Sequence, residues 1–559
     1  MPRRVAPGFI ELFTPKLVTV LREGYGLGHL RADVIAGLTV AIVALPLSMA
    51  IAIASGVSPD RGLYSAIVGG FIVSALGGSR FQVGGPAGAF IVLVLATVTL
   101  HGVDGLVLAT FLSGMMLVVM GFLRLGTFIK YIPFPVTVGF TAGVAVIIFA
   151  SQLRELFGLT LQGEPGEMLL KLEALWAVRH TITPPAVVVS FGTIAVILAV
   201  RRFRPHWPGM LIAVALAAGA SGLLDLPIAT VGSKFGGIPN GLPMPALPSL
   251  SVDKIMAVLP AALSFTLLGG IESLLSAVVA DNMSGQRHRS NCELVAQGVG
   301  NMGSAVFGGF CVTGTIARTA TNVRAGSRGP ISGMLHAVFL LLFMLVAAPL
   351  ASYIPLAALA GVLAVVSWNM FEKREFAVLV RASWGDAVVL LSTFLLVIFR
   401  DLTEGILVGF GLGTLLFLHR MAQAVEVQTG VAMVAEDQAD DAPGEVRLPY
   451  DPDIVVHRIS GAFFFGSAAN VAIALDHLAE RPKAFVLDFS AVPLLDSTAA
   501  STIESFVRKA GRRHAAVHIA GANPGVRRVL ESHEVRAPHV MFDANVVEAL
   551  AAARARKED

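Results

Sequence analysis

The chain has 559 residues, of which 55% are hydrophobic and 14% are charged, and its formal net charge is +3. This composition excludes an ordinary soluble protein, and so small a net charge argues against nucleic acid as a partner. The sequence contains two cysteines, Cys292 and Cys311, which are too few for a disulfide framework or a metal cluster. The sequence shows no phosphate-binding loop, zinc-ligand spacing or Ser/His/Asp set. We therefore expect a protein that is not an enzyme and that holds neither a metal nor a cofactor.

Residues 1–30 form a basic amino-terminal segment, in which no apolar stretch is followed by a small-residue cleavage site. We therefore expect no cleaved signal peptide. Residues 31–421 then hold a series of apolar runs with lengths near the ~20 residues that cross a bilayer core. In this transmembrane domain we expect about 14 spans, some of them short. Examples of the apolar runs are 35–54, 105–123, 136–150, 186–200, 210–224, 331–349 and 387–399.

The last part of the chain has a different character. Residues 422–452 are polar and acidic, as in "AEDQADDAPGE", and indicate a solvated linker. From 453 to 552, short apolar runs such as "AFVLDF" and "AVHIAG" alternate with helix-like stretches such as "STAASTIESFVRKAGRR". This alternation predicts a small α/β domain.

Lysine and arginine residues gather on one side of the expected spans. Besides the amino terminus, this side holds "RRFR" at 201–204, "QRHRS" at 286–290 and "EKRE" at 372–375. The positive-inside rule assigns such a side to the cytoplasm. We therefore expect a multi-pass protein of the bacterial cytoplasmic membrane, with both termini in the cytoplasm.

Two of the expected spans are interrupted by glycine and proline. The first break is "FQVGGPAGAF" at 81–90 and the second lies in "FGGFCVTGTIARTATNVRAG" at 307–326. Each break belongs to the third span of a series that starts with a long span containing a proline, Pro46 or Pro260. Broken spans in matching positions indicate a transporter with an inverted repeat, and irregular backbone at membrane depth is tolerated where it lines a cavity.

A short helical segment is expected after each break, at 87–100 and at 316–323. Two half-helices whose amino termini face each other would offer unpaired N–H groups and positive dipole ends to an anion. The alternative is that both breaks are simple kinks, because glycine and proline are common in membrane helices.

These residues resemble those of the sulfate permease (SulP) family of anion transporters. The resemblance lies in "DVIAGLTVAIVALPLSMAIAIASGVSPDRGLYSAIVGGFIVSALGGSRFQVGGPAGAF", in "GGIESLLSAVVADNMSGQRHRSNCELVAQGVGN" and in the arginine-bearing tenth span. The segment "FVLDFSAVPLLDSTAASTIESF" resembles a STAS domain. Within the family, the chain is most similar to the branch of bacterial proton-coupled C4-dicarboxylate transporters.

The resemblance implies a polytopic α-helical membrane protein of two inverted seven-span repeats, followed by a small α/β STAS domain. A core domain (spans 1–4 and 8–11) would hold the substrate and move, in the manner of an elevator, against a gate domain (spans 5–7 and 12–14). The resemblance also implies a homodimer.

Carried onto this chain, the site of the family lies between the broken third and tenth spans and faces the first and eighth. The substrate-binding residues that the resemblance implies are Gly85, Pro86, Ala87, Gly88, Ser276, Thr313, Gly314, Thr315, Ala317 and Arg318. The same comparison gives Glu272 the role of ion coupling, where sodium-coupled bicarbonate relatives carry Asp. The chain departs from the pattern at Leu47, where many members have Gln.

Several of these residues have a structural alternative. A carboxylate deep in a span is a functional candidate by default, although Glu272 could instead be a neutral acid bonded to a neighbouring helix. Arg318 is expected to neutralise the bound anion, with a tether to backbone carbonyls as the alternative. His336 is interpreted as a packed helix residue and Glu293 as a charge at a helix amino terminus.

In the tail, Ser497 follows Asp496 at the position where soluble STAS proteins of the anti-sigma-antagonist type carry a phosphorylatable serine. A helix-capping role at this turn is the preferred interpretation, and phosphorylation of Ser497 is a weaker regulatory hypothesis.

The sequence thus predicts a secondary active anion transporter, with proton-coupled uptake of succinate-like C4-dicarboxylates as the preferred activity. The alternative within the family is transport of sulfate, or of bicarbonate coupled to sodium. A nucleobase permease of the same fold and a membrane-anchored STAS signalling protein are further alternatives, which Arg318 and the number of spans disfavour. The expected partners are the anion, a proton or sodium ion, the bilayer, a second copy of the chain, and a cytoplasmic protein that binds the STAS domain.

Overall fold

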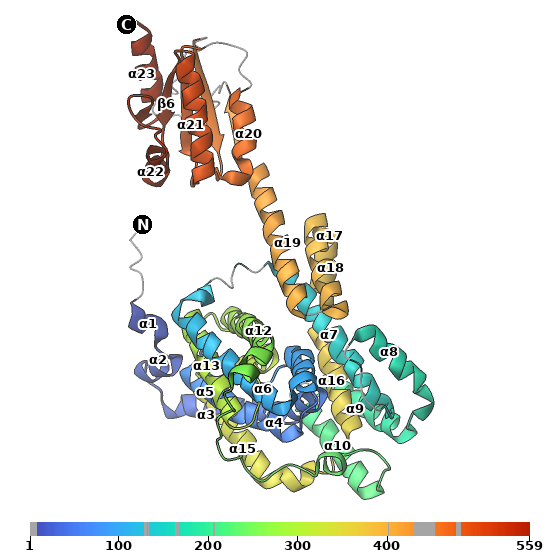
Figure 1. The fold of residues 1–559 in the computed structure, drawn as a ribbon. Helices are drawn as coiled ribbons and strands as arrows, with labels where there is room; N and C mark the ends of the chain where they lie inside the picture. The colour runs from blue at the N-terminus through green and yellow to red at the C-terminus, as the bar shows by residue number, and fades with distance from the viewer. Residues whose placement is uncertain are drawn as a thin grey trace. The chain divides into compact units, whose positions relative to one another are not determined.

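The computed structural model describes residues 8–127, 131, 133–161, 165, 167–204, 207–400, 402–429, 453–476 and 482–558. The chain divides into two compact units, Met1–Phe410 and Gly411–Asp559, and Figure 1 shows a helical first unit and a mixed α/β second unit. The boundary lies inside helix α19 (Leu402–Gln423), close to the predicted end of the transmembrane domain.

The first half of the helical unit runs from α1 to α11. Its elements are α1 (Phe9–Phe13), α2 (Lys16–Arg22), α3 (Leu27–Ala54), α4 (Pro59–Tyr64), a π-helical turn (Ser65–Gly69), α5 (Gly70–Leu76), β1 (Gly84–Gly85), a 3-10 turn (Gly88–Phe90), α6 (Ile91–Phe122), a 3-10 turn (Leu125–Thr127), α7 (Phe134–Phe157), α8 (Met168–Ala177), a 3-10 turn (Arg179–Thr181), α9 (Pro184–Phe203), α10 (Gly209–Leu224) and α11 (Val231–Phe235).

In the second half, as in the first, a long helix is followed further along the chain by a two-residue strand and then by another helix. Its elements are α12 (Val252–Ser284), α13 (Ser290–Val306), β2 (Thr313–Gly314), α14 (Ile316–Arg324), α15 (Ile331–Ala351), α16 (Leu356–Met370), α17 (Lys373–Ala382), α18 (Trp384–Phe399) and α19. The two long helices α3 and α12 contain Pro46 and Pro260, as the sequence indicated.

Eight helices among the described residues are long and apolar enough to cross a membrane. Others are short, such as α10 and α18. Helix α6 is interrupted at Gly102, whose φ of 68° and ψ of −175° are not helical, so α6 provides two successive segments. This pattern of long, short and broken segments is consistent with the expected series of spans.

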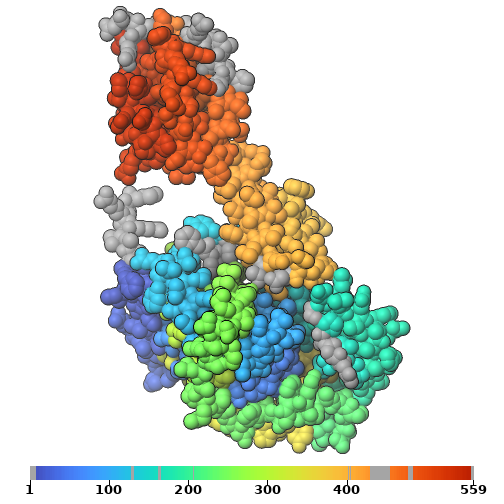
Figure 2. Space-filling model, in the orientation of Figure 1, coloured from blue at the N-terminus to red at the C-terminus, as the bar shows by residue number. Residues whose placement is uncertain are grey.

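The membrane helices pack in two groups, which we call the core group and the gate group. In the core group (α3–α6 and α12–α15), α6 packs on α12 and α13, α15 on α3 and α5, and α14 on α12 and α3. In the gate group (α7, α9, α10, α16 and α18), α7 packs on α16 and α18, and α9 on α10 and α16. Figure 2 shows α12, in green, and α6, in blue, side by side on the surface of the core group. The expected division into a core domain and a gate domain that move against each other stays a prediction.

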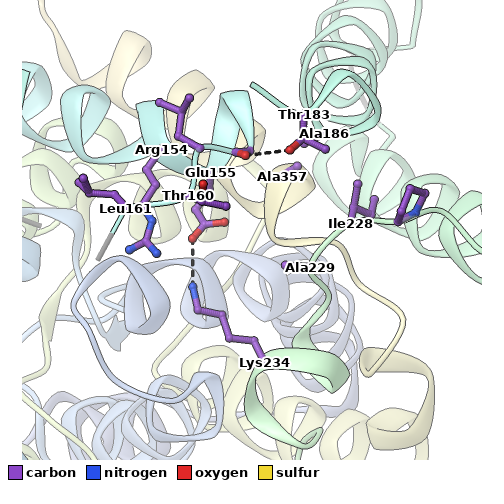
Figure 3. A pocket seen from close by; sticks show the side chains of 13 residues that line it. Arg154, Glu155, Thr160, Leu161, Thr183, Ala186, Ile228, Ala229, Lys234 and Ala357 are labelled. Carbon is purple, nitrogen blue, oxygen red and sulfur yellow. Dashed lines mark hydrogen bonds and ion pairs between the residues drawn. The ribbon is translucent and has the colours of Figure 1, made fainter. Parts of the chain in front are cut away.

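Two of the cavities among the described helices have linings that do not include the broken spans. One has a volume of about 480 Å³ and lies where α7 ends and α9 and α16 begin (Figure 3). The other, of about 550 Å³, is lined by apolar side chains of α3, α10 and α15. We call the first the gate pocket; its lining residues are Arg154, Glu155, Gly158, Leu159, Thr160, Leu161, Thr183, Ala186, Pro227, Ile228, Ala229, Lys234 and Ala357.

The second unit is a five-stranded sheet with helices on both faces. The strand order is β3 (Glu426–Thr429), β4 (Ile454–Ser460), β5 (Ala484–Ala491), β6 (Ala516–Ala520) and β7 (Met541–Asp543), with β3 antiparallel to β4 and the other pairs parallel. Helices α20 (Phe465–Asp476), α21 (Ser497–Arg512) and α22 (Pro524–Ser532) share one apolar core with the sheet, and α23 (Val546–Glu558) belongs to a second.

The structure corrects the predicted boundaries of this unit at both ends. Strand β3 lies in the segment 422–452, which the sequence indicated as linker. This part of the segment forms a strand because Val427 pairs with Ile459 and packs against the sheet core. Helix α23 continues to Glu558, beyond the predicted domain end at 552. The acidic stretch of the predicted linker, 430–452, lies outside the described residues.

Candidate functional site

The two broken spans meet at a pair of short antiparallel strands. In this pair, Gly84 of β1 lies opposite Gly314 of β2, and Gly85 lies opposite Thr313. The pairing continues through the Thr315 backbone N–H, which donates to the Val83 carbonyl at 3.1 Å. A 3-10 turn and helix α6 follow β1, and helix α14 follows β2. Two helices therefore begin next to the β1–β2 pair, which we call the strand crossing. The N–H groups and dipoles at the amino termini of these helices favour negative charge there.

Arg318 lies in α14 beside this crossing and is only 2% exposed. Its Nη2 atom donates to Ser48 Oγ of α3 at 3.0 Å and to the Pro86 carbonyl at 3.4 Å. A Cβ atom at Gly85 would overlap Arg318 Nη1, so only glycine lets the strand approach the guanidinium this closely. Arg318 is thus tethered to a backbone carbonyl, which was the alternative raised from the sequence, but only through one of its three side-chain nitrogens.

The other two nitrogens of Arg318, Nε and Nη1, are buried and have no hydrogen-bond partner among the described residues. Buried polar groups are almost always paired, and an unpaired donor of a charged group is costly. These N–H groups therefore provide an unused binding capacity for an anion at the strand crossing.

Glu272 and Ser276 lie one helical turn apart in α12, which packs against β2 and α14. Glu272 is half-buried, and its Oε2 atom is buried without a partner among the described residues. Ser276 is fully buried and donates to Thr319 Oγ1 at 3.1 Å, and the same Thr319 oxygen accepts the Val83 N–H at 3.2 Å. Ser276 therefore joins α12 to α14 and to the first break.

The threonines of the second break bond mainly to backbone carbonyls. Thr313 Oγ1 donates to the Gly269 carbonyl at 3.2 Å, and Thr315 Oγ1 donates to the Val83 carbonyl at 3.2 Å. Gly314 lies so close to the Gln82 amide that a Cβ atom would overlap it. Ala317 lies on the exposed side of the first turn of α14. These residues frame the crossing and remain predicted substrate contacts.

On the side of the first break, Ala87 is buried and Gly88 is half-buried. A Cβ atom at Gly88 would lie 3.1 Å from Ile148 Cδ1 and 3.6 Å from Met370 Sδ. Because Ile148 and Met370 belong to α7 and α16, the first break faces the gate group.

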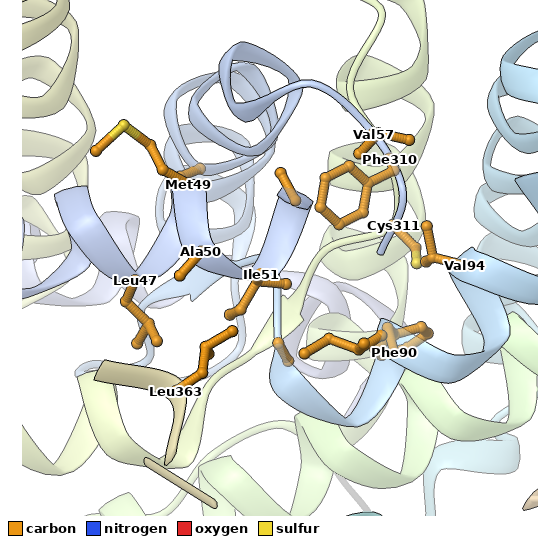
Figure 4. Close-up of a cluster of buried hydrophobic side chains, with 14 of the residues drawn as sticks. Leu47, Met49, Ala50, Ile51, Val57, Phe90, Val94, Phe310, Cys311 and Leu363 are labelled. Atoms are coloured by element: carbon orange, nitrogen blue, oxygen red, sulfur yellow. The ribbon is translucent and has the colours of Figure 1, made fainter. Parts of the chain in front are cut away.

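Apolar side chains of α3, α16 and the 3-10 turn Gly88–Phe90 pack together at the first break. Figure 4 shows Leu47 and Ile51 of α3 close to Leu363 of α16, with Phe90 nearby. Leu47, where many family members carry Gln, is 7% exposed and part of this hydrophobic cluster. The first span therefore supplies a polar contact through Ser48, one residue further along, which the sequence reasoning missed.

The sequence reasoning also missed a buried polar network behind the crossing. Glu293 is fully buried and accepts the Gln82 Nε2 amide at 2.8 Å, the Ser79 backbone N–H at 3.0 Å and the Gln297 amide at 3.4 Å. Gln82 also donates to Ser273 Oγ of α12 at 2.9 Å. Glu293 does lie in the first turn of α13, but the interpretation as a simple helix-end charge is incomplete. The spacing of four residues between Glu293 and Gln297 was the signal in the sequence that could have indicated this network.

In the second unit, Asp496 caps α21 as the sequence predicted. Its Oδ1 accepts the Ala499 N–H at 2.9 Å, and its Oδ2 accepts the Phe465 N–H at 2.8 Å. Ser497 is the first residue of the helix and is exposed. Its phosphorylation remains a prediction.

The comparisons with known proteins agree with this architecture. A profile of the sulfate permease family matches residues 30–393, and a STAS domain profile matches residues 445–549. The chain is 37% identical over 528 residues to the putative sulfate transporter YvdB of Bacillus subtilis, covering 93% of this chain and 97% of that protein. It is 30% identical to the bicarbonate transporter BicA of Picosynechococcus sp. over 530 residues, 90% of each chain.

Two solved structures support the fold. The murine Slc26a9 anion transporter in its inward-facing state matches with a TM-score of 0.83 at 17% identity, covering 99% of this chain and 96% of that chain. The transmembrane domain of a cyanobacterial BicA matches with a TM-score of 0.60 at 30% identity, covering 70% of this chain and 98% of that chain.

These matches settle the class of the protein but not the branch. The family consists of transporters rather than enzymes, and the relatives described above are named for sulfate and bicarbonate, so they do not support the predicted dicarboxylate branch. The chain is therefore a multi-pass membrane protein that belongs to the sulfate permease family of anion transporters and carries a carboxy-terminal STAS domain.

Proposed function

We propose that the protein is a secondary active transporter of small oxyanions, which bind at the crossing of β1 and β2. The observation that carries this proposal is the pair of buried Arg318 nitrogens, next to two helix amino termini, that have no partner in the described part of the chain. Each helix end supplies only about half a positive charge. Arg318 provides the full charge and the planar donor fork that suit a carboxylate or sulfate oxygen pair.

The preferred substrate of this proposal is an inorganic oxyanion, sulfate or bicarbonate, because the relatives in hand are named for these anions. A succinate-like dicarboxylate, which the sequence resemblance favoured, becomes the competing substrate. The proposal includes both termini in the cytoplasm and a movement of the core group against the gate group. Gly88 of the first break lies next to Ile148 and Met370 of the gate group, so the proposed site adjoins the surface where the two groups meet. This position supports the proposed movement.

We further propose that Glu272 couples transport to a proton. An ionised carboxylate without a partner at membrane depth costs several kcal/mol, and Glu272 Oε2 has no partner among the described residues. A protonated Glu272 removes that cost and does not repel an anion at the crossing. Proton and substrate would then each raise the affinity for the other by the same factor. Sodium bound by Glu272 and Ser276 is the alternative coupling ion.

The test is uptake by the purified full chain in liposomes. Labelled sulfate, bicarbonate and succinate are offered separately and in competition, each with an inward proton gradient, with an inward sodium gradient, or with neither. We expect sulfate or bicarbonate to be accumulated with the proton gradient and the accumulation to collapse with a protonophore. No uptake of any of the three would refute the proposed transport, and preferred uptake of succinate would restore the dicarboxylate assignment.

Glu272→Gln separates the two coupling ions. Since glutamine imitates the neutral acid, we expect this variant to bind substrate and to exchange it across the membrane, but to lose the pH dependence and the accumulation. Uptake by the unchanged protein that requires sodium and ignores the proton gradient would assign Glu272 to a sodium site instead.

A further inference from the structure

The gate pocket contains a cation, Arg154, whose side chain has no partner among the residues that the structure describes. Three charged side chains line the pocket: Arg154, Glu155 and Lys234. Lys234 Nζ lies 3.0 Å from Glu155 Oε1, so these two charges compensate each other. Among the residues that the structure describes, the Arg154 side chain makes neither a hydrogen bond nor an ion pair. Counted over its described lining residues, the pocket therefore carries one uncompensated positive charge.

Figure 3 shows how these side chains lie. The dashed line joins Lys234 to Glu155, whereas the guanidinium of Arg154 extends beside Leu161 and no dashed line reaches it. Leu161, Ile228 and Ala357 supply apolar surface around the charges. Low-dielectric walls strengthen the field of a charge within a cleft and raise the local concentration of the opposite ion.

The backbone around Arg154 is firmly held. The Leu159 N–H donates to the Arg154 carbonyl at 2.8 Å, and Gly158 ends α7 in a left-handed conformation with φ of 61°. Thr183 Oγ1 donates to the Gly158 carbonyl at 3.0 Å, which ties the end of α7 to the start of α9. A Cβ atom at Gly158 would lie 2.7 Å from Ala186 Cβ, so glycine permits this close approach. The pocket thus presents Arg154 from a rigid frame.

We propose that the gate pocket is a second anion site, separate from the strand crossing, which binds a small oxyanion such as sulfate through Arg154. A volume of about 480 Å³ accommodates such an ion with part of its hydration shell. The guanidinium fork binds two oxygens of a sulfate or carboxylate at once, and Lys234 supplies a further donor at the edge. In the movement proposed above, a site in the gate group would stay in place while the core group moves.

The test measures sulfate binding rather than transport, so that it does not depend on the function proposed above. Isothermal titration calorimetry is performed on the purified full chain at low ionic strength with a large organic anion as the background. In R318A, which removes the central site, we expect a weak sulfate site to remain. Adding R154Q should lower its affinity about threefold to tenfold, which corresponds to about 0.7–1.4 kcal/mol, the net contribution of a hydrogen bond that exchanges with water.

Two further variants serve as controls. R179Q removes an exposed arginine that stacks on Trp176 at 4.8 Å and does not line the pocket, so R318A/R179Q should bind sulfate as R318A does. R154K retains the charge and should bind sulfate more tightly than R154Q, which would show that the loss in R154Q follows the charge and not a disturbed fold.

An R318A protein that binds no sulfate, or whose sulfate binding is the same with and without Arg154, overturns the proposal. If the wild type transports no anion while R318A still shows Arg154-dependent binding, the second site stands and the proposed transport fails.

Discussion

Replacing Arg318 by alanine is the sharpest test of the site at the strand crossing. The side chain offers an anion two unused nitrogens, Nε and Nη1, in a setting that is 2% exposed. Hydrogen bonds to charged groups contribute about 1.5–3 kcal/mol each. Two of them together correspond to about 3–6 kcal/mol, which is roughly a 100-fold to 10⁴-fold loss of affinity. We therefore expect R318A to transport no measurable substrate.

The matched control is Arg324, which lies in the last turn of the same helix and is exposed. R324A removes the same charge from α14 without touching the crossing, so it should keep wild-type uptake. Arg318→Lys keeps the charge but loses the planar fork, and we expect it to recover only a small part of the activity. The assay is initial uptake into liposomes, normalised to protein that elutes as one peak and melts cooperatively. Uptake by R318A at the level of R324A would show that the anion binds elsewhere.

Three further predictions concern other parts of the chain. Gly88→Val should impair transport more than thermal stability, because its side chain would enter the contact with Ile148 and Met370; unchanged uptake with an intact protein would contradict this. Deleting residues from 451 onward should lower activity or the amount of protein in the membrane without changing the order of competing anions, and an altered order would argue against a purely regulatory tail. Burial lowers the pKa of His457 in β4 to about 4 from 6.5, so the unfolded state takes up the proton first as the pH falls. The carboxy-terminal unit should therefore lose up to about 3 kcal/mol of stability between pH 6.5 and 4. The loss is measured as a fall of the Tm with pH, and this fall should be less steep in His457→Gln. An equally steep fall in the variant would assign the effect to other groups.

The breaks of the two spans could be predicted because they are local features. Glycines and a proline inside long apolar runs interrupt a helix wherever they occur, and their matching positions indicated that the two breaks meet. The alternative of two simple kinks fails, because β1 and β2 pair across the crossing.

The partners of the polar side chains could not be predicted in the same way. Arg318 and Ser48 are 270 positions apart in the sequence, and Gln82 and Glu293 are 211 positions apart. Which buried polar residues meet depends on how each helix is rotated about its axis and on how deep it lies in the membrane. A membrane helix is apolar on most of its sides, so its sequence pattern reveals neither its rotation nor its depth. Strand β3 was missed for a related reason, since four residues next to an acidic stretch carry little strand signal until β4 provides the pairing edge.

The distribution of polar and apolar contacts around the crossing bears on how the site would move. The hydrogen bonds of Gln82, Thr315 and Arg318 connect the two breaks to each other and to α3, α12 and α13, all within the core group. The neighbours of Gly88 across the boundary, Ile148 and Met370, are apolar. Breaking a buried hydrogen bond costs the desolvation of its groups, whereas apolar contact is non-directional and tolerates sliding. A displacement along the boundary should therefore leave the strand pair, Arg318 and Glu293 in one rigid assembly, so that a bound anion and its ligands travel together.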